Sequence, residues 1–377
     1  MFNYLKKHYV LFLFILVTVV SIVIRICMLS FESSDYTIYL HPWFTYLQNN
    51  GGIKALATYI GNYNAPYMTI MALLTYLPIK DLISIKIVSI IFDFVLAFAS
   101  LLLVRKIVTK KKDLYGLITY TAVLFMPQVM MNSALWGQCD AIYASFVILS
   151  LYFLIDNKYF WSFICLGIAF AFKLQFIFIL PLYVIYYSTT KKYPFGYFFI
   201  ILLVNIIMCL PAIIVGKPIK DVLLIYFNQT ENYSDKLVKN FPNVYNLFNG
   251  NPKIFYKVGV IVALGVCLLL LIYCIKKKVK WNNEKIITFG IYSLVITTFL
   301  LPGMHERYLF AGEVLSIIYF IIYKKNYPLC LFMIVAPLIT YITFLNDRYF
   351  TLMPFLSLVY LIIIYFFTKD TLKLLKE

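Results

Sequence analysis

The chain has 377 residues, of which 63% are hydrophobic and 13% are charged, and its mean hydropathy is +0.87. Soluble domains contain about 45–50% apolar and roughly 25% charged residues. The composition therefore argues against a soluble enzyme, a disordered protein and a disulfide-rich secreted scaffold. It predicts an all-α polytopic membrane protein, built from segments that could fill spans of about 20 residues.

The formal net charge is +17, from 33 Lys and Arg against 16 Asp and Glu. In a soluble protein this excess would indicate a nucleic-acid partner. In a membrane protein it is expected from basic residues that remain on the cytoplasmic side, so we expect lipids and no nucleic acid as partners. The seven cysteines show no CxxC pair, and neither a disulfide framework nor a metal site is predicted from them.

Apolar runs predict about twelve membrane-spanning helices. A lysine, Lys173, separates two short runs, which could instead form one tilted helix and reduce the count to eleven. A further apolar run at 64–79 is only about 16 residues long and is predicted to be interfacial or re-entrant; as a full span it would raise the count to thirteen. The predicted spans are 8–30, 83–104, 114–131, 138–155, 159–172, 174–188, 195–215, 254–275, 285–302, 307–323, 327–345 and 349–368.

The basic residues support twelve spans with both chain ends in the cytoplasm. In that arrangement 20 of the 33 Lys and Arg fall in inner segments, whereas merging 159–188 into one span would place the later clusters outside. We therefore expect a multi-pass protein of the plasma membrane, with residues 1–377 forming one transmembrane domain. Its N-terminal module (1–215) contains the first outer loop, 31–82. The second outer loop, 216–253, separates this module from the C-terminal helices (254–377). Any chemistry would face away from the cytoplasm.

The first outer loop begins with two carboxylates, Glu32 and Asp35, directly after the first predicted span. A carboxylate at the membrane boundary is only partly solvated, so its basicity can be tuned for proton transfer. His41 and Trp43 follow, in an amphipathic stretch that is predicted to form a helix in the membrane interface. The alternative is an ordinary hydrophilic loop.

Further polar residues are predicted on the same side. Tyr67 follows a proline that stiffens the entry to the 64–79 run, although this segment could be a simple turn. Trp136, Gln138 and Asp140 connect two predicted spans at the outer face, where a membrane-embedded ligand would be met. Lys173 lies at the outer end of a span, where it either points into an outer cavity or extends to the lipid headgroups.

The segment LPGMHERYLF places His305, Glu306 and Arg307 at the expected outer start of the 307–323 helix. A cation at a helix N-terminus on the membrane boundary suits a phosphate group. The alternative is a salt bridge between Glu306 and Arg307. Asp93 falls inside the 83–104 span, where a carboxylate is either functional or paired with another helix.

The order of these segments resembles that of the GT-C superfamily of integral-membrane glycosyltransferases, in particular the glucosyltransferases that use dolichyl-phosphate-glucose and their bacterial relatives. The resemblance covers about residues 20–190 and returns near 300–310. It departs from the family in having Asn-Ala-Pro-Tyr in place of Tyr-Pro-Pro, and Arg307 in place of a lysine. The matching segments are the acid Asp35, the aromatic stretch after it, Asn64-Ala65-Pro66-Tyr67, ALWGQCDAIY, the Lys173 segment and His305-Glu306-Arg307.

The resemblance implies a GT-C fold, a polyprenyl-phosphate-linked sugar donor and inversion at the anomeric carbon. It also implies that Asp35 is the catalytic acid residue of the first loop and that His305 and Arg307, with Lys173, lie near the donor phosphate. Such a transfer needs one carboxylate to accept the acceptor hydroxyl proton and cations for the departing phosphate. The remaining candidates for binding the sugar or the acceptor are Glu32, His41, Trp43, Tyr67, Trp136, Gln138 and Asp140.

The predicted function is therefore a hexosyltransferase that moves one sugar from a lipid phosphate to an envelope glycan, a lipid-linked saccharide or a teichoic acid. No cofactor is expected, with a divalent metal as the alternative way to stabilise the phosphate. Two other functions stay open. One is a flippase or transporter of lipid-linked sugars, for which the sequence shows no internal repeat, and the other is a polysaccharide polymerase.

Overall fold

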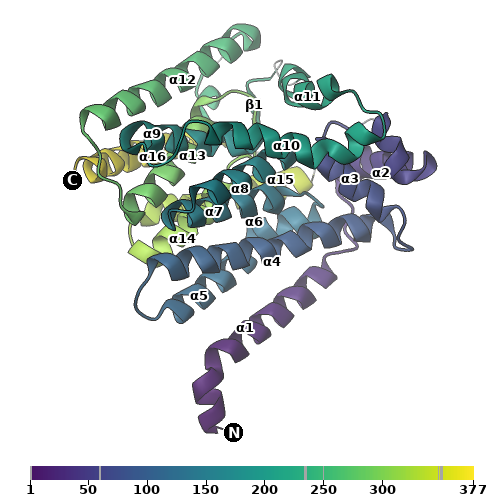
Figure 1. Cartoon of the computed structure of the whole chain (residues 1–377), viewed down its shortest axis with the longest axis horizontal. Coiled ribbons are helices and arrows are strands. Elements are labelled where there is room, and N and C mark those ends of the chain that lie inside the picture. Colours follow the sequence, from purple (N-terminus) through teal and green to yellow (C-terminus); the bar gives the residue numbers. More distant parts are fainter. Residues whose placement is uncertain (1, 59–60, 233–235, 249, 347, 349–350) are drawn as a thin grey trace.

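The computed structural model describes residues 2–58, 61–232, 236–248, 250–346, 348 and 351–377, and 78% of the chain is helical (Figure 1). This confirms the all-α class. The principal helices are α1 (Phe2–Cys27), α4 (Asp81–Ile107), α5 (Lys112–Leu124), α7 (Asp140–Ile155), α8 (Tyr159–Phe172), α9 (Leu180–Thr190), α10 (Tyr197–Ile214), α11 (Ile219–Asn232), α12 (Pro252–Lys276), α13 (Asn283–Leu300), α14 (Phe310–Tyr323), α15 (Tyr327–Leu345) and α16 (Met353–Lys376).

Shorter elements connect these helices. They are α2 (His41–Asn49), α3 (Ala65–Leu74), α6 (Pro127–Met130), the strands β1 (Val238–Lys239) and β2 (Met304–His305), and single helical turns of 3₁₀ or π type at Tyr36–Leu40, Gly52–Ala57, Met131–Leu135, Leu174–Ile179 and Val244–Asn246.

Each of the twelve predicted spans coincides with a helix or with two consecutive helices. In the described part of the chain, six helices (α1, α4, α10, α12, α15 and α16) are long and apolar enough to cross a membrane. The count is seven if α5 and the segment Pro127–Leu135, which meet at a bend of 53°, form one span. The remaining helices are shorter or, like the 18-residue α13, do not combine the necessary length and hydropathy. The polytopic membrane protein is therefore confirmed, while the count of twelve crossings stays a prediction.

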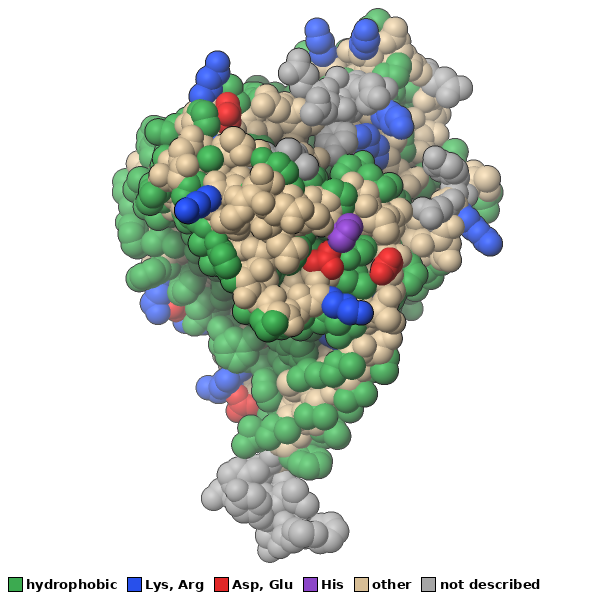
Figure 2. All heavy atoms as spheres, turned by 90° about the vertical axis from the view of Figure 1, so that its right-hand side faces the viewer, with side chains coloured by type: hydrophobic (Ala, Val, Ile, Leu, Met, Phe, Trp, Pro, Cys, Tyr) green, Lys and Arg blue, Asp and Glu red, His purple; other side chains and the backbone are tan. Residues whose placement is uncertain are grey.

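The apolar surface of the molecule fits a lipid environment. On the face drawn in Figure 2, hydrophobic side chains cover much of the flanks and of the part of the N-terminal arm that the structure describes, and charged side chains are few there. Large apolar side chains such as Ile214 on α10 and Leu269 on α12 are exposed. In water such continuous apolar surface would be unfavourable, whereas in a bilayer it costs nothing.

The centre of the bundle is formed by α4, α7, α8 and α10, which pack side by side (Figure 1). Helix α1 leans away from this group and is joined to it by a buried ion pair. Arg25 Nε donates to Asp93 Oδ2 at 2.8 Å, and both side chains are at most 1% exposed. The carboxylate inside the predicted 83–104 span is therefore paired with a neighbouring helix.

Three details of the sequence prediction are corrected or decided by the structure. Lys173 has an extended backbone (φ −148°, ψ 140°) that ends α8 and begins a 3₁₀ turn, so the single tilted helix over 159–188 is wrong. Helix α14 begins at Phe310, not at residue 307. The amphipathic helix expected after Asp35 forms as α2, but its apolar residues Trp43, Phe44 and Leu47 are buried in protein instead of facing outward.

The run at 64–79 forms a helix that is too short to cross a bilayer. Helix α3 has ten residues, which span about 15 Å at 1.5 Å per residue, half of the roughly 30 Å hydrocarbon core. Asn64 caps its N-terminus by accepting a hydrogen bond from Ala65 N at 2.9 Å, and Pro66 occupies the first turn.

A short parallel strand pair joins the second outer loop to the segment between α13 and α14. Val238 pairs with Met304 and Lys239 pairs with His305. The bond from Gly303 N to Leu237 O at 2.8 Å extends this pairing. The strand pairing brings residues that are more than 60 positions apart in the sequence to one end of the helix bundle.

Candidate active site

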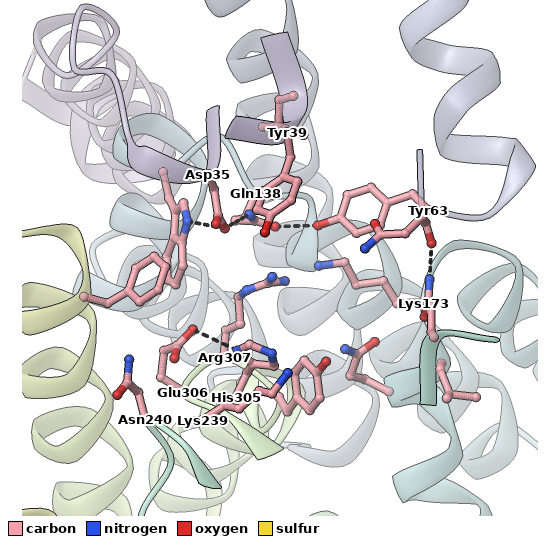
Figure 3. A pocket seen from close by; sticks show the side chains of 18 of the residues that line it. Asp35, Tyr39, Tyr63, Gln138, Lys173, Lys239, Asn240, His305, Glu306 and Arg307 are labelled. Carbon is pink, nitrogen blue, oxygen red and sulfur yellow. Dashed lines mark hydrogen bonds and ion pairs between the residues drawn. The ribbon is translucent and has the colours of Figure 1, made fainter. Parts of the chain in front are cut away.

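A cavity of about 510 Å³ opens at this end of the bundle (Figure 3). Its walls come from the segment after α1, the turn before α7, the break at Lys173, α11 and β1, the residues around β2, and the last turn of α15. Each of these segments was predicted from the sequence to lie on the outer side or at the outer end of a span. The cavity therefore gathers the predicted outer segments in one place.

Asp35 is held on one wall by two hydrogen bonds. Trp136 Nε1 donates to Asp35 Oδ2 at 2.8 Å, and Gln138 Nε2 donates to the same oxygen at 2.7 Å. Tyr63 in turn donates to Gln138 Oε1 at 2.7 Å. Because both bonds go to Oδ2, they fix the carboxyl orientation without engaging Oδ1, and the half-buried side chain still lines the cavity.

The backbone before α7 makes this arrangement possible. Gly137 lies between Trp136 and Gln138 with φ +78°, a left-handed conformation that glycine adopts without strain. Gln138 N donates to Asn132 O at 2.8 Å, which closes the turn. Both side chains can therefore reach Asp35 from positions two residues apart in one turn.

A second group of charges lies below this wall and centres on Asp140, whose side chain is 0% exposed. Lys173 Nζ donates to Asp140 Oδ1 at 2.6 Å, Asn132 Nδ2 donates to Oδ2 at 2.8 Å, and Arg307 Nη1 lies 3.6 Å from Oδ2. Lys173 is itself 3% exposed, so it does not extend to lipid headgroups. Asp140 does not line the cavity; instead it holds two cations that do.

Arg307 reaches across the cavity floor. Its guanidinium carbon lies 5.4 Å from the centre of the Trp136 ring, and the side chain is 13% exposed. In Figure 3 it points into the space between Asp35 and Gln138 on one side and His305 and Glu306 on the other. Arg307 therefore pairs with Asp140 and stacks on Trp136, and the alternative of a salt bridge with Glu306 is not what the structure shows.

His305, whose side chain is 22% exposed, and Glu306, whose side chain is 1% exposed, lie in the cavity wall at the end of β2. Burial and the nearby Arg307, Lys239 and Lys173 cations hold the pKa of His305 well below its usual range, so its imidazole is neutral at pH 7. Burial also raises the pKa of Glu306 to about 8, although Arg307 opposes this. Because α14 begins only at Phe310, these residues lie in a turn before the helix and not in its first turn.

The other predicted candidates divide into two groups. Trp43, Trp136 and Gln138 line the cavity, whereas Tyr67 is buried behind it and packs edge-on against Tyr63 with ring centres 5.0 Å apart. Two further candidates do not line the cavity. Glu32 is exposed, and His41 Nδ1 lies 2.6 Å from Asp81 Oδ2 on the surface.

Several lining residues were not singled out from the sequence. Lys236 and Lys239 come from the second outer loop. Basic residues are depleted on the outer side of membrane proteins, so two lysines in a loop predicted to be outside could have identified them as candidates. Tyr39, Gln175 and Gln229 carry no motif that could have identified them. Gln229 donates to the Asn62 carbonyl, which ties α11 to the segment before α3.

Within the described residues there is no group of three or more His, Cys, Asp or Glu side chains placed to hold a metal ion. The charged groups that face the cavity are instead mostly cations together with Asp35 and Glu306. What the arrangement offers chemically is an oriented carboxylate opposite a cationic wall.

Comparisons with known proteins identify one family. The family model described as "Glycosyltransferase family 87" matches residues 59–302, which is more than half of the chain. No curated protein and no solved structure matches the sequence. The family is a GT-C-like family of membrane glycosyltransferases, so the resemblance noted in the sequence is confirmed.

Proposed function

Since the chain belongs to glycosyltransferase family 87 and is a multi-pass membrane glycosyltransferase, we propose that it transfers one sugar from a polyprenyl-phosphate-linked donor to an envelope glycan or lipid-linked acceptor, with inversion. The observation that carries this proposal is the single cavity with Asp35 on one wall and Arg307, Lys173 and His305 opposite. A carboxylate and a cationic wall are the two groups that such a transfer needs.

Asp35 acts as the general base in this proposal. The acceptor hydroxyl attacks the anomeric carbon, the bond from that carbon to the phosphate oxygen breaks, and the hydroxyl proton passes to the Asp35 carboxylate. The donors Trp136 Nε1 and Gln138 Nε2 hold Oδ2 in place, so Oδ1 can accept the proton without reorientation. Such positioned proton transfer contributes roughly 10²–10⁴-fold to a rate.

The departing lipid phosphate carries negative charge and needs compensating groups. Arg307 offers a planar guanidinium, and its Nε is buried without a hydrogen-bond partner in the structure. Neutral His305 can donate one hydrogen bond, and Lys173 contributes positive potential although its charge is shared with Asp140. These groups would allow transfer without a metal ion, and we propose that no cofactor is required.

The origin of the cavity walls supports an active site on the extracytoplasmic face of the plasma membrane. The walls come from segments predicted to be outside, whereas the lysine clusters predicted to be inside lie elsewhere, such as Lys325 and Lys373 around a separate surface hollow. The family match favours sugar transfer over flipping. A polymerase would differ in adding many sugars, which product length reveals.

The test compares Asp35→Asn with Asp81→Asn in purified protein. Both change a carboxylate of the first-loop region, but Asp81 pairs with His41 outside the cavity. We expect Asp35→Asn to lose at least 10²-fold in transfer from a polyprenyl-phosphate hexose, while Asp81→Asn stays near wild type. Near-normal turnover in a folded Asp35→Asn protein would rule out the proposed base.

A further inference from the structure

Glu306 is a buried carboxyl group that the protein leaves without hydrogen bonds. Its side chain is 1% exposed, and neither carboxyl oxygen has a hydrogen-bond partner. The nearest titratable partner is the neutral imidazole of His305, whose Nδ1 lies 3.9 Å from Glu306 Oε1, beyond hydrogen-bond range. An unsatisfied buried polar group costs about 1–3 kcal/mol, so a group of this kind requires an explanation. Glu306 differs from the equally unpartnered Glu313 in lining the cavity, where a ligand could supply the missing hydrogen bonds.

The neighbouring cation does not neutralise this group. Arg307, the next residue, is directed to Asp140 and Trp136. Burial therefore dominates and raises the pKa of Glu306 to about 8. Below that pH the carboxyl group carries a proton, and it then offers one O–H donor and one carbonyl acceptor.

A group that offers both a hydrogen-bond donor and an acceptor suits the hydroxyl groups of a sugar. Sugar hydroxyl groups both donate and accept hydrogen bonds, and aromatic rings commonly cover the apolar faces of small ligands in pockets. Tyr39, which is 46% exposed, and Phe344 line the same cavity as Glu306. In Figure 3 Glu306 lies across the cavity from Asp35. Its carboxyl oxygens are covered in the structure, so a rotation of the Glu306 side chain is needed to bring them to a sugar placed between the two residues.

We propose that Glu306 binds hydroxyl groups of the transferred sugar and thereby helps to select it. This inference rests on the proposed function, because it assigns the sugar-binding part of the same cavity. A site that hydrogen-bonds a hydroxyl group rejects an analogue that lacks it, since a buried polar group is then left unpaired. In this account Glu306 binds the sugar, whereas Arg307 and His305 bind the donor phosphate.

The experiment measures binding by thermal stabilisation of purified protein with two probes, a short-chain prenyl-phosphate hexose and the same prenyl phosphate without sugar. Glucose, mannose and galactose donors are compared at pH 7. The variants are Glu306→Gln, which keeps a donor and an acceptor, and Glu306→Leu, which keeps neither. Glu313→Gln is the matched control, because Glu313 is equally buried with both oxygens unpartnered but does not line the cavity.

We expect Glu306→Leu to bind the preferred prenyl-phosphate hexose roughly tenfold more weakly, as expected for one lost hydrogen-bonding group, and to bind prenyl phosphate as the wild type does. Glu306→Gln and Glu313→Gln should keep the preference. If the wild type responds to no prenyl-phosphate hexose, the proposed function fails. If the wild type responds and Glu306→Leu responds equally, only the role of Glu306 fails.

A pH series keeps the inference testable if Glu306→Leu does not fold. Wild-type binding of the hexose donor should weaken as the pH rises through about 8, because ionised Glu306 loses its donor, whereas Glu306→Gln should not show this loss. Every other titratable group is present in both the wild type and Glu306→Gln, so the difference between their pH profiles of donor binding reports the titration of Glu306. Identical profiles would overturn the inference. The groups that face Glu306 are His305, Arg307, Asp35, Asp140, Tyr341 and Tyr360.

Discussion

Replacing Lys173 by methionine tests whether the buried charges below the cavity depend on one another. The substitution keeps the length of the side chain but removes the ammonium group 2.6 Å from Asp140 Oδ1. Breaking a buried ion pair by removing one partner costs about 3–5 kcal/mol, because the other charge remains buried. Asp140 would keep Asn132 at 2.8 Å and Arg307 at 3.6 Å, so the lower end, about 3 kcal/mol, is expected.

The matched control is Lys325→Met. Lys325 Nζ lies at the same 2.6 Å distance from a carboxylate, that of Glu284, but its side chain is 56% exposed. An exposed pair contributes about 0–1 kcal/mol because water screens it. Thermal unfolding in detergent should therefore show a midpoint lower by roughly 5 °C for Lys173→Met and little change for Lys325→Met.

A double variant, Lys173→Met with Asp140→Asn, should be more stable than Lys173→Met alone, since the stranded carboxylate is then neutral. The reasoning is refuted if Lys173→Met unfolds at the same temperature as Lys325→Met. It is also refuted if neutralising Asp140 brings no recovery.

Two further predictions concern the turn before α7. Trp136→Phe removes the N–H that donates to Asp35 Oδ2 at 2.8 Å while keeping an aromatic ring, so kcat should fall roughly tenfold. Because Trp136 is 0% exposed, the smaller ring should also lower the unfolding midpoint, so kcat is compared per folded protein; an unaltered kcat would show that this bond does not orient the base. Gly137→Ala meets no atom closer than 3.7 Å, yet its φ of +78° should cost about 1–2 kcal/mol, measured as a lower unfolding midpoint; unchanged stability would contradict the strain argument.

The sequence predicted the segments that form the site better than the roles of their residues. The rule that basic residues stay inside placed Asp35, Trp136, Lys173 and Arg307 on one side of the membrane, and the structure brings these four residues together around one cavity. Their common location agrees with that placement, which follows from hydropathy and charge because these are properties of single segments.

The sequence did not predict which of these residues line the cavity and which pair with one another behind it. Asp140 follows Trp136 and Gln138 by only a few positions, yet it is buried behind the cavity, because the first turn of α7 directs it towards Lys173. Lys239 reaches the site through its pairing with His305, which depends on a contact between distant segments. The alternative interpretation, a salt bridge of Arg307 with Glu306, is not found because Arg307 pairs with Asp140 from another segment instead.

The proposed reaction is tested most directly by mixing purified protein with a polyprenyl-phosphate hexose and an acceptor extract and measuring the released polyprenyl phosphate. We expect release that requires the acceptor, that Asp35→Asn abolishes, and that a metal chelator does not change. Transfer from a soluble nucleotide sugar, or movement of the intact lipid-linked sugar across a vesicle membrane without release of polyprenyl phosphate, would contradict the proposed function.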